Sequence, residues 1–285
     1  MSDLTVRHPR IDIAALDLPT VWVTGDAFRT QAFNALSQSF PIGEQYFIDA
    51  VRAALPLIDD AALRDDIRRF IGQEATHSGL HRILNARLTD LGLRNRVEPR
   101  VVRRIRRMEG LGVRSKLAIT MAYEHFTAVL GDTLLRQPDW LDGASEPMRV
   151  LWQWHAVEEC EHRAVAADAY RALGGGEGRR IGWFLWVSLL FAVDTSVQTI
   201  DNLRRSGHLG HMATWAQGLR FLFGRRGLVR AVMPAWFAYL RPAFSPRDRG
   251  DDEAARRWLA THTAWFVAQA PTSQGVHRQA PPARA

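Results

Sequence analysis

The sequence predicts an all-α protein. Apolar residues recur every three or four positions through the middle of the chain, which is the period of an amphipathic helix. No run of alternating β-branched residues bounded by turn residues occurs, so β-strands are not expected. With 285 residues, 47% of them hydrophobic, the chain is long enough to bury a sizeable core.

Four long helices are predicted, and residues typical of helix ends mark the first two. Helix one is expected to begin near Pro41, because proline suits a first helical turn, and to kink or end at Pro56. Helix two follows Asp59 or Asp60 as its N-cap and ends at Gly92. Each helix is expected to pack one face against the core.

A connection of about twenty residues separates the first pair of helices from the second pair. Part of it, residues 97–108, is expected to be helical. Helix three is expected over residues 115–135, and helix four begins at Glu146 and Pro147 and runs to the glycines at 174–176. The length of the connection permits a crossover along a four-helix bundle.

The chain is predicted to divide into four segments. Residues 1–26 form an N-terminal segment, residues 27–176 the bundle, residues 177–270 a helical extension, and residues 271–285 a disordered tail. The extension contains 13 mostly apolar residues, 181–193, which is fewer than the roughly 18 needed to span a bilayer. It is expected to cover the bundle, with a membrane-surface or lipid-handling element as the alternative.

Composition predicts a cytoplasmic protein, with membrane association as an alternative. Cys160 is the only cysteine, which excludes internal disulfides, and the first twenty residues lack the apolar block of a secretory signal. The formal net charge is +7, and Lys116 is the only lysine. Arginines cluster at residues 93–110 and 220–230, where solvated helix faces are the simpler interpretation and an anionic partner such as a lipid headgroup is the alternative. No nucleic-acid partner is predicted.

The core-facing stripes of the four predicted helices turn polar in the middle. Helices two and four each carry a Glu-x-x-His pair on this stripe, and helices one and three each place one glutamate among apolar residues. Residues three apart on a helix share a face, so such a pair can ligate one metal ion together. The predicted metal ligands are Glu44, Glu74, His77, Glu124, Glu159 and His162.

Metal ions would explain why four carboxylates share one core. Buried without cations, the carboxylates would have to be protonated or otherwise compensated, and two metal ions supply that compensation. The ligand order repeats, since Glu44 precedes Glu74 by 30 residues and Glu124 precedes Glu159 by 35. This is the ligand set of ferritin-like di-iron and di-manganese proteins. The alternative is a set of core polar residues that hydrogen-bond one another.

Three further residues lie beside the predicted ligands. His81 and His155 are each one helical turn from a ligand, and both fall at the same end of the site if helices two and four are antiparallel. They are candidates for extra ligands, for hydrogen-bond partners of the ligands or for a proton relay, with ordinary core histidines as the alternative. Glu158 is rotated off the core stripe by about 100° relative to Glu159, so it is predicted to contact the ligands.

Four segments resemble a bacterial family. The segments GEQYFIDAVR, FIGQEATHSGLHR, YEHFTAVL and WHAVEECEHRAVAADAY are similar to those of predicted metal-dependent hydrolases, over roughly residues 25 to 250. Members of that family look like ferritin-like di-metal proteins. The resemblance implies a ferritin-like four-helix bundle in which the six predicted ligands hold two metal ions. Because carboxylates outnumber histidines, iron is the expected metal, with manganese or a mixed manganese–iron pair as the alternative.

Three functions are compatible with such a site. The leading hypothesis is an O₂-activating di-iron enzyme that oxidises an apolar small molecule or acyl substrate, with an electron donor protein as partner. The second is a hydrolase that uses a two-metal-activated water, and the third is a metal-binding bundle without catalysis. The aromatic segment from Trp183 to Phe191 is expected to line a substrate channel. A homodimer is one candidate assembly.

Overall fold

The computed structural model describes residues 4–23, 25–248 and 252–267, and it confirms the all-α class. Within these ranges there is no strand, and an isolated bridge joins Pro9 and Phe266. The predicted tail, 271–285, lies outside the described residues, and the division into four segments stays a prediction. The helices are α1 (Ala27–Ala54), α2 (Ala61–Asp90), α3 (Val97–Arg107), α4 (Val113–Arg136), α5 (Glu146–His162), α6 (Val165–Ala172), α7 (Glu177–Arg205), α8 (Met212–Phe223), α9 (Leu228–Tyr239) and α10 (Glu253–Thr261).

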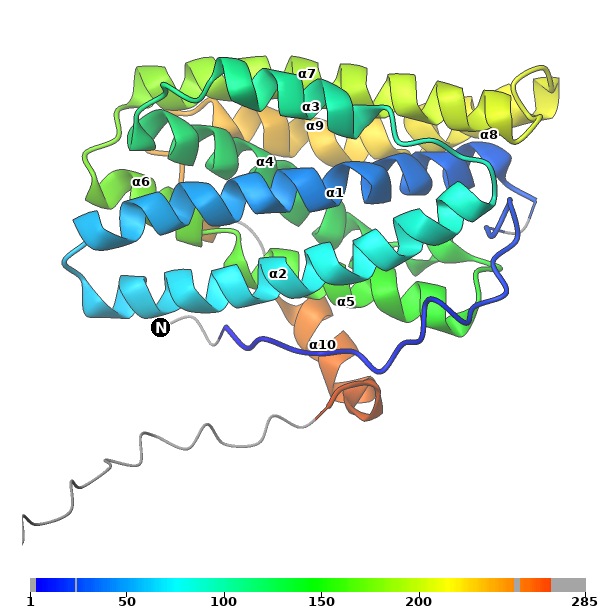
Figure 1. Ribbon diagram of the computed structural model, residues 1–285, viewed down its shortest axis with the longest axis horizontal. Coiled ribbons are helices and arrows are strands. Elements are labelled where there is room, and N and C mark those ends of the chain that lie inside the picture. Colours follow the sequence, from blue (N-terminus) through cyan, green and yellow to red (C-terminus); the bar gives the residue numbers. More distant parts are fainter. Residues whose placement is uncertain (1–3, 24, 249–251, 268–285) are drawn as a thin grey trace, which may run out of the picture.

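The helices that carry the predicted ligands form a bundle (Figure 1). α1 packs along α2, α4 packs along α5, and contacts between α1 and α4 join the two pairs. The interior contains two apolar clusters, one around Phe70 and Leu117 and the other around Leu84 and Leu151. On α2 the polar middle lies between them. This arrangement is compatible with the ferritin-like bundle that the family resemblance implies.

α1 begins well before Pro41, so the start predicted for helix one was wrong. Asp26 caps the helix, because its Oδ1 accepts the backbone N–H of Arg29 at 2.8 Å. Pro41 lies inside the helix, where packing on both sides holds the chain helical. The first half of α1 escaped prediction because its buried face carries amides that obscure the apolar period, namely Gln31, Asn34 and Gln38.

Predicted helix four is divided into α5 and α6, which is a second difference from the prediction. The break comes at Arg163 and Ala164, directly after His162. Arg163 Nη1 donates to the backbone carbonyl of Cys160 at 2.7 Å. In an uninterrupted helix that carbonyl would accept the N–H of residue 164. The break therefore ends α5 at the last predicted ligand.

α7 covers the bundle and is longer than the apolar run within it suggested. It has 29 residues and, by length and composition alone, is apolar enough to cross a membrane, although only 22% of its most apolar 18-residue window is buried. It packs across α1 and α4 (Figure 1). Its inward side is polar: Asp194 accepts from Arg104 Nη1 at 2.9 Å, and Asn202 donates to Gln38 Oε1 at 2.9 Å. The apolar run 181–193 is too short by itself to span a bilayer, whereas the helix that contains it is long enough.

The close contact between α4 and α5 predicts an effect of Gly131→Ala. A Cβ atom at Gly131 would lie 2.8 Å from the carbonyl oxygen of Ala156, so the two helices would have to move apart. We expect the free energy of unfolding to fall by about 1–3 kcal/mol in urea titrations followed by circular dichroism. Gly79→Ala in α2 is the matched control, because no atom lies within 4 Å of its Cβ position, and it should leave stability unchanged or raised. Equal urea midpoints for Gly131→Ala and the natural chain would contradict the prediction.

Candidate metal centre

The six predicted ligands converge in the polar middle of the bundle. Each is at most 3% exposed, so none is a surface charge. The Glu-x-x-His spacing places each pair on one face of its helix, and the two pairs face each other across the core. α1 supplies Glu44, α2 supplies Glu74 and His77, α4 supplies Glu124, and α5 supplies Glu159 and His162.

One cluster of donor atoms surrounds His162. Its Nε2 lies 3.1 Å from Glu74 Oε1, 3.1 Å from Glu124 Oε2 and 3.4 Å from Glu159 Oε2. Ligand atoms of Glu74, Glu159 and His162 all lie within 4.8 Å of one another. The four side chains come from α2, α4 and α5, and they form a compact cage for one cation.

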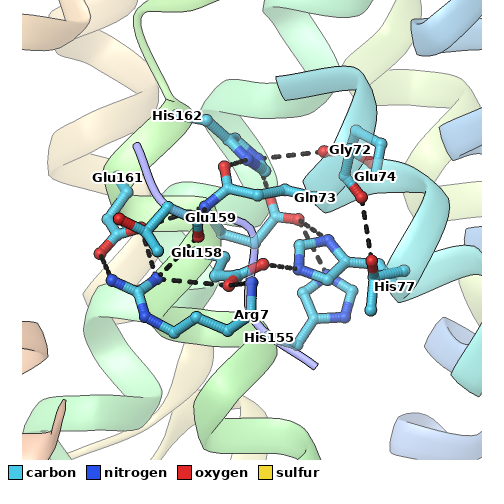
Figure 2. Close-up of polar contacts among 12 residues, drawn as sticks. Arg7, Gly72, Gln73, Glu74, His77, His155, Glu158, Glu159, Glu161 and His162 are labelled. Carbon is cyan, nitrogen blue, oxygen red and sulfur yellow. Dashed lines mark hydrogen bonds and ion pairs between the residues drawn. The ribbon is translucent and has the colours of Figure 1, made fainter. Parts of the chain in front are cut away.

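A second cluster lies beside the first and shares Glu159 with it. Ligand atoms of Glu44, His77 and His155 lie within 4.8 Å of one another. Glu159 Oε1 is 3.7 Å from His77 Nδ1 and 2.8 Å from His155 Nε2 (Figure 2). Because the other oxygen of Glu159 faces His162, this carboxylate is placed to bridge two cations.

The buried donor atoms fit metal ions better than they fit one another. Among the described residues, no hydrogen bond of normal geometry reaches either carboxylate oxygen of Glu44, Glu74 or Glu124. The inward ring nitrogens of His77 and His162 also lack one. Buried polar groups in proteins are normally satisfied, so this concentration of unsatisfied lone pairs indicates ligands whose partner is a cation.

Electrostatics supports the same interpretation. Burial raises the pKa of Glu44 and Glu74 well above the usual value, and nearby carboxylates raise both further. Burial also raises the pKa of Glu124 to about 7. Although burial alone would lower it, the pKa of His162 lies well above its usual value because Glu124, Glu159 and Glu74 surround the ring. The raised pKa values of these groups mean that, without metal ions, bound protons reduce the buried negative charge. Metal ions would compensate the same charge.

A chain of hydrogen bonds fixes the tautomer of His81. The amide nitrogen of Asn85 donates to the Ser37 backbone carbonyl at 2.9 Å, so the amide oxygen accepts from the Ser37 hydroxyl at 2.8 Å. Having donated its hydrogen, Ser37 Oγ accepts from His81 Nδ1 at 2.9 Å. Burial holds the pKa of His81 well below its usual value, so the ring is neutral and its Nε2 carries a lone pair.

His155 is consequently turned toward the metal ligands. Its Nδ1 lies 2.8 Å from His81 Nε2 and supplies the hydrogen of that bond. Its other ring nitrogen, Nε2, faces the carboxylate of Glu159 and lies 2.8 Å from Oε1. A proton or a cation between these two atoms would make the contact favourable. Of the roles that the sequence left open, the geometry favours His155 as a further ligand and His81 as its positioning residue.

The other two histidines are oriented in the same way. His77 Nε2 lies 3.1 Å from Glu158 Oε2, and His162 Nδ1 lies 3.1 Å from Gln73 Oε1 (Figure 2). Gln73 and Glu158 each precede a ligand glutamate by one residue and each contact the histidine of the opposite helix. The expected contact of Glu158 with a ligand is therefore present. Gln73 precedes Glu74 as Glu158 precedes Glu159. This matching position in the sequence could have identified Gln73 as a contact of a candidate ligand.

A segment near the N-terminus, which we call the N-terminal strap, supports the contacts of Gln73 and Glu158 through Arg7. Arg7 lies 3.3 Å from Glu158 Oε1, and its guanidinium donates to both oxygens of Glu161 at 2.8 Å (Figure 2). Gln73 Nε2 donates to Glu161 Oε2 at 3.1 Å, which leaves its oxygen facing His162. No sequence pattern indicated Arg7, because it reaches residues more than 150 positions away.

Two cavities extend to the candidate metal centre. One of about 590 Å³ lies between the bundle and α7, α8 and α9, and one of about 80 Å³ lies between α1, α3, α4 and α7. His155 and Glu159 line both. Of the aromatic segment expected to line a channel, Trp183 and Trp186 border the smaller cavity and Phe191 borders both.

Comparison with known proteins gives one match. The family described as predicted metal-dependent hydrolase matches residues 5–250. The chain belongs to this family. No curated protein and no solved structure matches it. Membership in the family agrees with the buried histidine and glutamate clusters in supporting bound metal ions, and it favours hydrolysis over oxidation as the chemistry.

The shared position of Glu159 predicts that Glu159→Gln loses metal. We expect about two metal ions per natural chain and at least one fewer in the variant, because this carboxylate faces both clusters. Mass spectrometry of the metal content after dialysis measures the difference. Glu109→Gln is the matched control, since this carboxylate is exposed in the turn after α3 and its loss should leave the metal content unchanged. Equal metal content in Glu159→Gln and the natural chain would contradict the prediction.

Proposed function

We propose that the protein is a two-metal-ion hydrolase that cleaves an apolar substrate of the acyl ester or amide type. One observation carries the proposal: His155 and Glu159 belong to the candidate metal centre and also line the 590 Å³ cavity. A substrate held in the cavity would present its reacting group to the metal ligands. Membership in the family supports hydrolysis as the reaction.

The size and walls of the cavity favour an extended apolar group. Small-molecule sites in proteins measure roughly 300–1,000 Å³ and are mostly apolar. Phe40, Phe126 and Trp152 form aromatic walls next to the two metal-ligand residues. An acyl chain would bury its hydrocarbon against these walls, with its carbonyl carbon at the polar end. The walls also exclude bulk water from the reacting group.

The candidate metal ligands and the residues that contact them have different roles in the proposed site. Two bound ions would supply Lewis acidity, which polarises a carbonyl group and lowers the pKa of water. Each of three imidazole rings is held by a neighbouring side chain so that one ring nitrogen faces inward. Gln73 contacts His162, Glu158 contacts His77, and His81 contacts His155. Glu159 directs one carboxylate oxygen toward each cluster. Iron, manganese or a mixed pair suits this carboxylate-rich donor set.

Oxidation by a di-iron centre is the second candidate, and the donor set favours it. Four carboxylates with a Glu-x-x-His pair on each of two helices are the ligands of ferritin-like di-iron proteins. A cavity with aromatic walls would also suit the oxidation of an apolar substrate. This reaction would draw electrons from a donor protein, whereas hydrolysis needs none.

The origin of the oxygen atom in the product separates the two candidates. Protein loaded with iron or manganese is incubated with medium- and long-chain acyl thioesters and 4-nitrophenyl esters, either in ¹⁸O-labelled water without O₂ or under ¹⁸O₂ with a chemical reductant. We expect anaerobic turnover that places ¹⁸O from water in the released acid. Oxygen from O₂ in the product would assign oxidation. Metal-loaded protein that performs neither reaction would overturn both candidates and leave a metal-binding bundle.

The cavity predicts selectivity for chain length that depends on Ala192. This residue is exposed on α7 and lines the 590 Å³ cavity, so Ala192→Trp should narrow it without disturbing the core. We expect KM for long acyl chains to rise roughly tenfold while short chains are little affected. Ala62→Trp, on an exposed position at the start of α2, is the matched control. An equal change for short and long chains would argue that the substrate lies elsewhere.

A further inference from the structure

The outer surface of α7, α8 and α9 is unusually apolar. Eleven of the fourteen large hydrophobic side chains exposed among the described residues lie on these three helices. Several are more than half exposed, including Phe223 at 61%. We call this set the outer apolar face. It comprises Leu185, Trp186, Leu189, Val193, Val197 and Ile200 of α7, Met212, Trp215, Leu219 and Phe223 of α8, and Phe237 of α9.

α7 is amphipathic in the opposite sense to a helix that covers a soluble protein. Its buried side chains include Arg180, Asp194, Gln198 and Asn202, and each is held by bonds to the rest of the protein. Six large apolar side chains of α7 face outward, although Phe184, Val187 and Leu203 are buried. Because soluble monomers rarely expose a large contiguous apolar surface, such a face indicates a partner.

The surroundings of this face are rich in arginine, and three of these arginines, Arg205, Arg226 and Arg247, pair with aspartates that lie outside residues 202–247. Residues 202–247, which include α8 and α9, contain eight arginines and no aspartate or glutamate. Arg225 and Arg226 are exposed in the turn between α8 and α9. On the other side of α7 lies α3 (Figure 1), whose arginines 103, 106 and 107 are exposed. An apolar centre with arginines around it is complementary to an anionic lipid surface.

We propose that the outer apolar face docks on the surface of a bilayer that contains anionic lipid. α7 would lie in the plane of the interface, because its bonded polar side ties it to α1 and α3 and prevents it from leaving the bundle to span the membrane. Trp186, Trp215 and Phe223 are the side chains that would enter the acyl region, where aromatic residues are favoured.

A second copy of the chain fits the face less well than a membrane does. A two-fold dimer would pair the face with itself, so the flanking arginines of α3 and of the α8–α9 turn would lie near arginines of the second copy. Residues 202–247 contain no carboxylate, and the acid that pairs with Arg226, Asp139, comes from another segment. Anionic headgroups compensate these charges, whereas a second copy repeats them.

Docking would also place the 590 Å³ cavity next to the lipid. Ile200, Trp215 and Leu219 are exposed members of the outer apolar face and also line this cavity. An apolar substrate dissolved in the bilayer could enter without crossing water. This role in delivery rests on the proposed function, whereas the docking itself does not depend on the chemistry.

Vesicle flotation tests the docking. The full chain is mixed with vesicles of phosphatidylcholine alone or with added phosphatidylglycerol, at low and high salt. We expect stronger binding to the anionic vesicles, weakened by salt, and a loss on the order of tenfold in Leu189→Asp and in Arg103→Ser/Arg106→Ser/Arg107→Ser. Leu57→Asp and Arg68→Ser, exposed on other parts of the surface, should bind like the natural chain. Thermal melting checks that every variant is folded.

Two outcomes would overturn the docking proposal. One is the absence of vesicle binding, and a concentration-dependent dimer that Leu189→Asp abolishes would then assign the face to a second copy. The other is binding that neither lipid charge nor the face variants alter. Metal-free protein prepared with a chelator should bind vesicles as well as loaded protein does. Failure of the hydrolase proposal would therefore leave this result intact, and a lack of docking would leave the metal centre intact.

Discussion

The mutual repulsion of buried carboxylates is the constraint on which the rest of this structure depends. Four glutamates from four helices occupy the middle of one core, where burial raises the pKa of Glu44, Glu74 and Glu124. Without compensation this core would favour an open bundle. Apolar clusters on either side hold the helices together, and the lone pairs that converge between them lack hydrogen-bond donors. Bound cations would relieve the repulsion and, under the proposed function, would also be the reactive element.

The outer contacts follow from the need to aim one nitrogen of each of three imidazole rings inward. Gln73 and Glu158 occupy equivalent positions on the two Glu-x-x-His helices and each bonds to the histidine of the opposite helix. His81 does the same for His155. Arg7 of the strap contacts Glu158 directly and holds Gln73 through Glu161, so a segment with no candidate ligand of its own supports the geometry of the centre.

α7 links the metal centre to the outside of the molecule. Its polar side binds the bundle, its middle borders both cavities and its apolar side faces outward. One helix therefore serves three roles that ordinarily require opposite hydrophobic patterns. The combination is consistent with a protein that takes an apolar molecule from a lipid surface and presents it to buried polar groups.

Sequence alone determined the helical class, the ends of α2 and the six ligand candidates, because helical periodicity and capping are local and a Glu-x-x-His pair lies on one helical face whatever surrounds it. It misplaced the start of α1, where the buried amides Gln31, Asn34 and Gln38 bind partners outside the helix, namely Thr20, Trp22 and Asn202. Only the tertiary structure decided that His155 faces the ligands and that Arg7 supports them. Both depend on contacts between helices, whose distances and directions are set by packing rather than by spacing along the chain.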